Sequence, residues 1–203
     1  GSTREGLLFK LSSSLLQSWV RPMPSGFNYQ YPTPIDMAVK GSTIVVLMKS
    51  LTTAGNNSYE LRAVSQSTGN ITIGGQSGTI FNYLTPVSLA VDASQNVYVC
   101  GEITSNNGIL IKHDTGLFQL WTKTYTTGGR TWFSSIATDV SGNVYVAGAG
   151  FNTTASRYRT IVRKYNSAGA LQSSYSSGNL PQGNYWPTVG PKMKISAGGD
   201  VYV

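Results

Sequence analysis

The chain has 203 residues and a net charge of +7, with only 11% charged residues and 23 glycines. Its 15 basic residues are scattered without a Lys/Arg run, which excludes a specific nucleic-acid interface of the basic-arm type. A single cysteine, Cys100, excludes an intrachain disulfide and a zinc site built on several thiolates, and we expect no cofactor and no metal. No apolar segment approaches the roughly 18 residues that span a bilayer, so a soluble protein without membrane insertion is expected.

The first predicted element is a β-hairpin near the start of the chain, which begins Gly1-Ser2 as a cloning remnant or a cut polypeptide would. Apolar and basic residues alternate over residues 7–11, a turn of serines follows, and a second strand covers residues 16–19. The same strand, polar turn and strand return at residues 59–73, 109–121 and 160–175. This element therefore occurs four times.

A second kind of hairpin alternates with the first along the chain. Residues 88–101 align without a gap with residues 135–148, and both consist of an apolar strand, a polar turn and a strand containing Val-Tyr-Val. A further copy covers residues 193–203, and a degenerate copy covers residues 37–47. Asp92 and Asp139 are suited to bond the turn backbone, while Gly142, or Asn96 and Asn143, are suited to its positive φ.

Two hairpins in each repeat of roughly 50 residues give four strands in each repeat, which is typical of β-propeller blades. We therefore predict an all-β fold, a β-propeller of four-stranded antiparallel blades with four repeats in this chain. The prediction is one domain, residues 1–203, with blades at approximately 37–84, 85–131, 132–189, and 190–203 completed by residues 1–36.

Residues 139–148 with 161–171 resemble the repeat of a family of bacterial and viral β-propellers. That repeat reads roughly Asp-x-x-Gly-Asn-x-Tyr-Val-x-Gly, followed by a strand ending in Lys-Tyr or Lys-Phe and a turn before Leu-x-Trp. Residues 92–101 with 109–121 fit nearly as well, whereas the repeat starting at Met37 lacks the Asp, Asn and Tyr. The resemblance implies a fold and not an activity.

The last and first segments of the chain together make up one complete repeat. Val201-Tyr202-Val203 stops where the other repeats continue into their outer hairpin, and the chain opens with such an outer hairpin. We expect the N-terminal strands to complete the last blade and so remove exposed sheet edges. The closure predicts a monomeric ring or a strand-complemented homodimer, and a segment of a longer propeller is the third alternative.

The sequence offers no convincing catalytic group. His113 stands beside Asp114 without a nucleophile or a third orienting residue, and we interpret the two as a polar pair at a strand end. Asp92 and Asp139 are explained by turns, which leaves no acid/base pair of carboxylates and no calcium loop. We therefore predict no catalytic residues and a protein that is not an enzyme; an enzyme would need groups from another chain or a bound metal.

Aromatic side chains in Gly-, Pro- and Asn-rich segments between the repeats are the candidate binding residues. They stack on sugar faces or anchor a protein partner in many interfaces, and the alternative is packing between adjacent blades. Among them, Tyr29, Trp132 and Tyr185 are expected to face solvent. The full candidate set for ligand or partner binding is Tyr29, Tyr31, Tyr83, Arg130, Trp132, Tyr185 and Trp186.

These features predict a non-enzymatic structural or binding module, a propeller domain of a virion (phage tail or fibre) or of a bacterial cell-surface protein. The low charge and the many Ser, Thr and Asn residues favour an extracellular or virion location. The expected partners are other protein subunits or surface glycans. Two alternatives remain open: a designed or excised repeat propeller that self-assembles, and a lectin-like carbohydrate-binding propeller.

Overall fold

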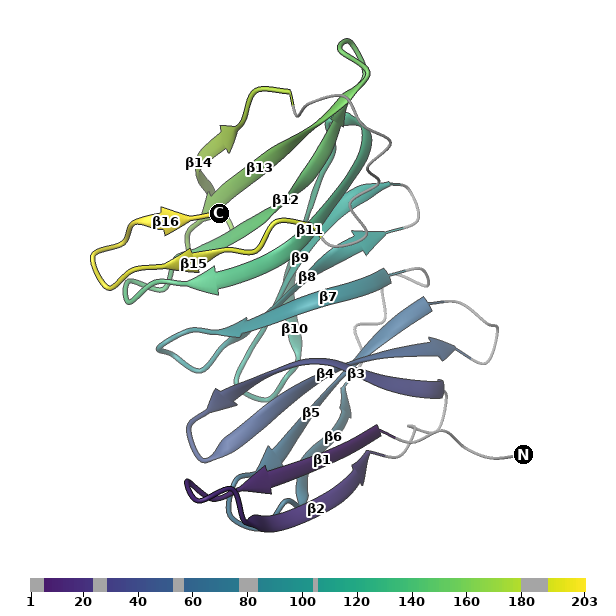
Figure 1. Ribbon diagram of the computed structural model, residues 1–203, viewed down its shortest axis with the longest axis vertical. Helices are drawn as coiled ribbons and strands as arrows, with labels where there is room; N and C mark the ends of the chain where they lie inside the picture. Colours follow the sequence, from purple (N-terminus) through teal and green to yellow (C-terminus); the bar gives the residue numbers. More distant parts are fainter. Residues whose placement is uncertain (1–5, 24–28, 53–56, 77–83, 104–105, 180–189) are drawn as a thin grey trace.

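The computed structural model describes residues 6–23, 29–52, 57–76, 84–103, 106–179 and 190–203. In these residues the protein is all-β, with three four-stranded antiparallel sheets and a two-stranded sheet at each end (Figure 1). The first two-stranded sheet contains β1 (Gly6–Leu11) and β2 (Gln17–Met23). The first four-stranded sheet contains β3 (Tyr29–Lys40), β4 (Thr43–Thr52), β5 (Asn57–Ser65) and β6 (Ile71–Gln76).

The remaining strands follow in the same manner. The middle sheet contains β7 (Leu84–Val91), β8 (Val97–Ile103), β9 (Asn107–His113) and β10 (Gln119–Tyr125). The third sheet contains β11 (Gly128–Thr138), β12 (Val144–Asn152), β13 (Arg157–Tyr165) and β14 (Leu171–Ser176). The last two-stranded sheet contains β15 (Lys194–Ile195) and β16 (Val201–Tyr202).

Each four-stranded sheet is a meander in which every strand pairs with its sequence neighbour, and the sheets stack face to face as propeller blades do (Figure 1). The prediction of an all-β protein with four-stranded antiparallel sheets is confirmed. The first of these sheets begins at residue 29 and not at residue 37, because pairing of β3 with β4 continues past two register shifts as far as Tyr29 and Thr52.

The described residues do not form a closed ring. β1–β2 and β15–β16 are separate sheets at opposite ends of the stack (Figure 1), so the described residues of the predicted last blade, 190–203 with 6–23 and 29–36, do not share one sheet within this chain. The physical reason is that three intervening sheets, packed face to face, hold the two hairpins apart. The chain therefore presents a hairpin at each end of an open stack.

Hydrophobic clusters fill the four spaces between successive sheets of the described residues. In β8, Val97 and Val99 pack toward the first four-stranded sheet, whereas Tyr98 and Cys100 pack toward the third. Successive side chains of a strand point to opposite faces, so a central strand buried on both faces is a continuous apolar run. Cys100 is a small core residue, since its side chain is fully buried.

The predicted aspartate turn forms in both aligned repeats. Asp139 Oδ1 accepts a hydrogen bond from the Asn143 amide at 2.9 Å, and Asp139 Oδ2 accepts bonds from Asn143 Nδ2 at 2.8 Å and from the Tyr145 hydroxyl at 3.1 Å. The carboxylate thus ties the turn to the strand that follows it. The equivalent residues of the middle sheet are Asp92, Asn96 and Tyr98.

The positive φ of this turn occurs one residue before the asparagine. Gly142 has φ 77°, as expected, but in the middle sheet Gln95 has φ 67° and takes the place predicted for Asn96. Asparagine tolerates the left-handed conformation better than glutamine, which is why the sequence favoured it. The geometry of the turn places the positive φ at Gln95 instead, because the side chain of Asn96 is held by the Asp92 carboxylate.

Gly148 occupies a position where β12 passes a register shift in β11. A Cβ atom there would overlap the carbonyl oxygen of Trp132, a backbone atom that cannot rotate away. Gly101 meets the Thr85 carbonyl in the same manner. Glycine is required at both positions because β-bulges bring two backbones close together.

We expect Gly148→Ala to lower the free energy of unfolding by about 1–3 kcal/mol, because the new methyl group forces a backbone shift in a packed sheet. Urea denaturation followed by circular dichroism measures the change. Gly178→Ala is the matched control, since nothing lies within 4 Å of its added Cβ, and it should change stability by less than about 0.5 kcal/mol. Equal stability of the two variants would contradict the close approach.

Candidate functional site

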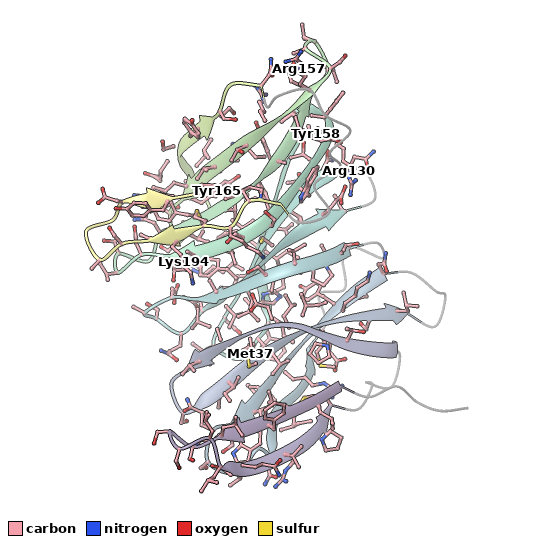
Figure 2. The ribbon with its side chains drawn as sticks, viewed as in Figure 1. Met37, Arg130, Arg157, Tyr158, Tyr165 and Lys194 are labelled. Carbon is pink, nitrogen blue, oxygen red and sulfur yellow. The ribbon has the colours of Figure 1, made fainter. Side chains whose placement is uncertain are left out.

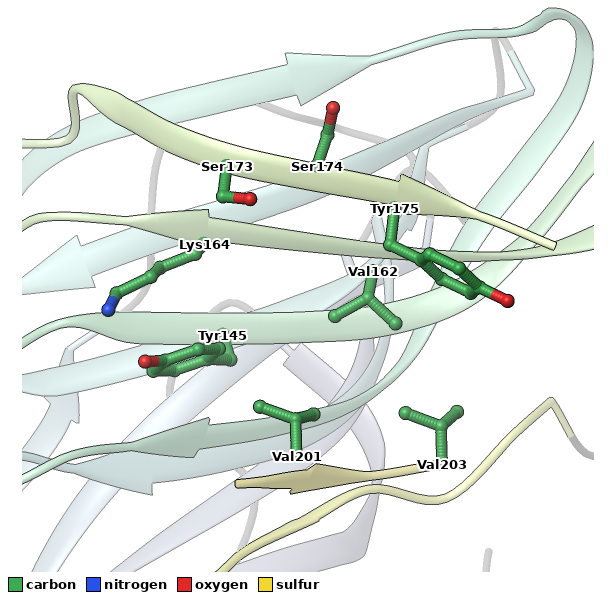
Figure 3. Close-up of a pocket in the computed structure, with 8 residues that line it drawn as sticks. All are labelled: Tyr145, Val162, Lys164, Ser173, Ser174, Tyr175, Val201 and Val203. Atoms are coloured by element: carbon green, nitrogen blue, oxygen red, sulfur yellow. The ribbon is translucent and has the colours of Figure 1, made fainter. Parts of the chain in front are cut away.

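A groove lies between the third four-stranded sheet and the C-terminal hairpin β15–β16, and we call it the C-terminal groove. It contains a cavity of about 460 Å³, shown in Figure 3, and an adjoining cavity of about 540 Å³ that extends along the turns at residues 138–141 and 195–199. Both cavities share Tyr145 and Lys164. The first is lined by Tyr145, Val162, Lys164, Ser173, Ser174, Tyr175, Val201 and Val203.

Lys164 is the charged group shared by both cavities. Its Nζ lies 5.0 Å from the centroid of the Tyr145 ring and 3.9 Å from Asp139 Oδ2. Interaction with Tyr145 and, more weakly, the charge of Asp139 raise the pKa of Lys164 above its ordinary value, although burial opposes this. The groove therefore combines the Lys164 amine with side chains of β13, β14 and β16, several of them apolar (Figure 3).

The equivalent lysine inside the stack is covered. Lys112 Nζ lies 5.5 Å from the centroid of the Tyr98 ring and donates a hydrogen bond at 2.8 Å to the carbonyl oxygen of Ser167, in the outer turn of the next sheet. Lys112 is 7% exposed, whereas the Lys164 side chain is 32% exposed. The C-terminal groove is thus the space that the outer hairpin of a further sheet would occupy.

The opposite end of the stack has the complementary gap. The hairpin β1–β2 covers β4 and β5 of the first four-stranded sheet through Leu8, Trp19 and Met23. It leaves part of the inner strand β3 uncovered, and Met37 (Figure 2) and Val39 are 58% and 66% exposed. We call the exposed side chains Ile35, Met37 and Val39 the β3 stripe.

Residues in the register position of Met37 are buried in the other four-stranded sheets. Met37 pairs with Val46, as Leu89 pairs with Val99 and Ile136 with a valine of β12. Leu89 is 5% exposed and Ile136 is 7% exposed. Among the described residues no inner hairpin packs over the β3 stripe, and its exposure therefore does not reflect a different surface chemistry.

Arg130 and Trp132 are the two predicted binding residues whose side chains the structure describes. Arg130 donates two hydrogen bonds to the Glu102 carboxylate, at 2.7 and 2.8 Å, and its guanidinium lies 5.0 Å from the Trp132 ring centroid. Trp132 meets Tyr158 edge to face, with ring centroids 5.4 Å apart. Trp132 is 7% exposed, so the expectation that it faces solvent is wrong, and its ring is not a sugar-stacking platform.

The other predicted binding residues lie, as whole residues or with their side chains, outside the described part of the chain. Tyr29 and Tyr31 belong to strand β3, but their side chains lie outside the described part of the chain. Tyr83, Tyr185 and Trp186 lie outside the described residues altogether. The sequence interpretation missed the C-terminal groove and the β3 stripe, because a regular alternation of apolar residues does not reveal which face lacks a neighbouring sheet.

His113 is a core residue that bridges two sheets. Its Nε2 lies 2.9 Å from the hydroxyl oxygen of Tyr59, and its side chain is 2% exposed. His113 does not form the expected hydrogen-bonded pair with Asp114. The Asp114 carboxylate instead accepts hydrogen bonds from the backbone amides of Gly116 and Phe118. Burial lowers the pKa of His113 to about 4, although a backbone hydrogen bond and the Asp114 charge oppose the shift.

The described residues contain no group of three or more His, Cys, Asp or Glu side chains that is placed to hold a metal ion. Nor does this part of the chain contain a helix that is long and apolar enough to cross a membrane.

No protein-family model and no curated protein matches the chain. Among solved structures, the native arabinanase of Bacillus subtilis is similar, with 13% sequence identity, a TM-score of 0.41, and coverage of 90% of this chain and 75% of that chain. That neighbour is an enzyme and contradicts the prediction that this chain is not one, so we drop the prediction. At this identity and TM-score the likeness assigns no activity in its place.

We expect acid to destabilise the protein through His113. A histidine titrates near pH 6.5 when exposed and near pH 4 in the folded chain, so between these values the unfolded state binds more protons. The free energy of unfolding should therefore fall from pH 6.5 to pH 4, by up to about 1.4 kcal/mol per pH unit. Urea denaturation at several pH values measures the slope, and His113→Gln should reduce it. Parallel slopes for the two proteins would contradict a buried neutral histidine.

Proposed function

We propose that this chain is a structural or binding module that joins other protein subunits through the two end faces of its stack of sheets. The observation that carries the proposal is the exposure of Met37, at 58%, where the equivalent Leu89 is 5% exposed inside the stack. The side chains at both ends are those of an inter-sheet core. A surface of this kind is typical of a protein–protein interface.

The energetic reason is the hydrophobic effect. Full burial of a single Val, Leu, Ile, Phe or Met side chain stabilises an association by roughly 1.5–3 kcal/mol. The N-terminal end offers the β3 stripe together with Leu7 and Phe9, which are 65% and 57% exposed. The C-terminal end offers Tyr202 and Val203, which are 63% and 55% exposed. Several such residues on one end face favour a stable contact with another subunit.

The proposed setting is a virion, as part of a phage tail or fibre, or a bacterial cell-surface protein. The low fraction of charged residues, 11%, and the high content of glycine and of residues with hydroxyl groups support this setting. In such assemblies repeated subunits meet through large apolar contacts, which bury more surface than transient encounters do.

The end faces can be tested through self-association of the chain. We expect light scattering over a range of concentrations to show masses above that of one chain, and Met37→Lys to weaken the association by at least about tenfold, because a buried unpaired charge replaces an apolar contact. Leu120→Lys is the matched control, since Leu120 is 53% exposed on the outer strand β10, away from both ends.

Circular dichroism of each variant distinguishes loss of contact from loss of folding. A wild-type chain that stays monomeric at every concentration tested would contradict the proposal. So would equal weakening by Met37→Lys and Leu120→Lys, because the end face would then have no special role.

A further inference from the structure

The two end faces complement each other, and we propose that they are joined between two copies of this chain. The hairpin β1–β2 of one copy adds to the hairpin β15–β16 of a second copy, giving one four-stranded sheet in the order β15-β16-β1-β2. This inference rests on the proposed function and names the partner: a second copy of the same chain. The contact fills the C-terminal groove of one copy and covers the β3 stripe of the other.

The hairpin β1–β2 is an outer hairpin by its contacts with the following sheet. Lys10 Nζ and Trp19 Nε1 each donate a hydrogen bond at 3.1 Å to the carbonyl oxygen of Gln66. The outer hairpin β9–β10 contacts the third sheet in the same way, through donors on a lysine and a tryptophan at 2.8 and 3.3 Å. The residues in that case are Lys112, Trp121 and Ser167.

The hairpin β15–β16 is an inner hairpin by its turn and its packing. The Asp200 amide donates to Ser196 Oγ at 3.0 Å, which reproduces the contact of the Asn143 amide with Asp139. Met193 packs against Tyr145 in the cluster between the third sheet and this hairpin. One end of the chain therefore holds an inner hairpin, and the other end holds an outer hairpin.

The register of the joined sheet follows from the middle sheet. There β8 pairs with β9 so that Val99 lies opposite Ile111, and both side chains are fully buried against the first sheet. The aligned residues are Val203 and Phe9, which are 55% and 57% exposed in the single chain. Because Val203 lines the cavity of about 460 Å³ (Figure 3), a phenyl ring opposite it fills that cavity.

The opposite face of the joined sheet gains a cation–π contact. Tyr98 pairs with Lys112 across β8 and β9, and the amine lies 5.5 Å from the ring centroid. The same register places Lys10 opposite Tyr202, whose side chain is 63% exposed in the single chain. An ammonium group over an exposed tyrosine ring stabilises the pair and selects its register.

Lys164 gains the acceptor that its equivalent already has. Lys112 donates to the carbonyl of Ser167, the second residue of an outer turn. The outer turn of β1–β2 is closed by the bond from the Ser12 amide to the Leu16 carbonyl, as the other outer turns are, and its second residue is Ser13. The joined sheet therefore presents the Ser13 carbonyl of one copy to the Lys164 amine of the other.

The test uses two single-cysteine chains, both carrying Cys100→Ser, so that a disulfide can form only between copies. Phe9→Cys in one chain and Val203→Cys in the other place the two thiols opposite each other in the proposed register. Opposite residues of paired strands have Cα atoms within the range that a disulfide bridges. After mixing and mild oxidation, we expect a disulfide-linked heterodimer on a non-reducing gel, confirmed by intact mass.

The matched control replaces Val203→Cys by Tyr202→Cys, whose side chain points to the other face of the sheet. We expect at least about tenfold less heterodimer from this mixture. A second pair, Leu11→Cys with Val201→Cys, repeats the test two residues along the strands and guards against a local effect of losing Phe9. The proposed register requires that both opposite pairs form the disulfide-linked heterodimer.

The outcomes separate this inference from the proposed function. Association in light scattering without preferential linkage of the opposite pairs would overturn the strand pairing and leave the proposed function standing. Absence of association would overturn both. A chain carrying Phe9→Cys and Val203→Cys together that forms its disulfide within one monomer would show that the hairpins meet in the same chain, which also overturns the pairing between copies.

Discussion

Burial of each sheet on both faces is the constraint on which the rest of the structure depends. The central strands are apolar on both sides, as in β8, where Val97 and Val99 face one neighbour and Tyr98 and Cys100 face the other. A sheet of this kind is stable only between two others, because a solvent-facing antiparallel sheet needs a polar outer face. Stacking therefore stabilises the four-stranded sheets, and the ends of the stack expose apolar side chains such as Met37 and Val203.

A second interaction links each sheet to the next at its rim. A lysine amine donates to the carbonyl of the second residue of the following outer turn, at Gln66 and at Ser167. The turn at Thr115 receives such a bond too, but from Lys40 of β3, because the residue of β5 that aligns with these lysines is Ala63, which carries no amine. Three outer turns of the chain therefore accept a lysine hydrogen bond from the preceding sheet, although the lysine comes from an inner strand in one case and from an outer hairpin in the other two.

Much of the fold could be predicted from the residues, and the candidate site could not. The hairpins, the aspartate turns and the core position of Cys100 follow from local patterns, because alternation and turn chemistry act over a few residues. The burial of Trp132 and the pairing of His113 with Tyr59 depend on neighbours from other repeats or strands. No local pattern carries that information.

The sequence by itself determined four strands in each repeat, their order within a sheet, and the identity of β1–β2 and β15–β16 as outer and inner hairpins. Only the tertiary structure decided that these two hairpins lie at opposite ends of an open stack (Figure 1). It also decided which equivalent residues are exposed, since Met37 and Leu89 differ in the presence of a covering sheet and not in their own chemistry. The physical reason is that strand pattern is local, whereas coverage depends on the number and placement of sheets around each face.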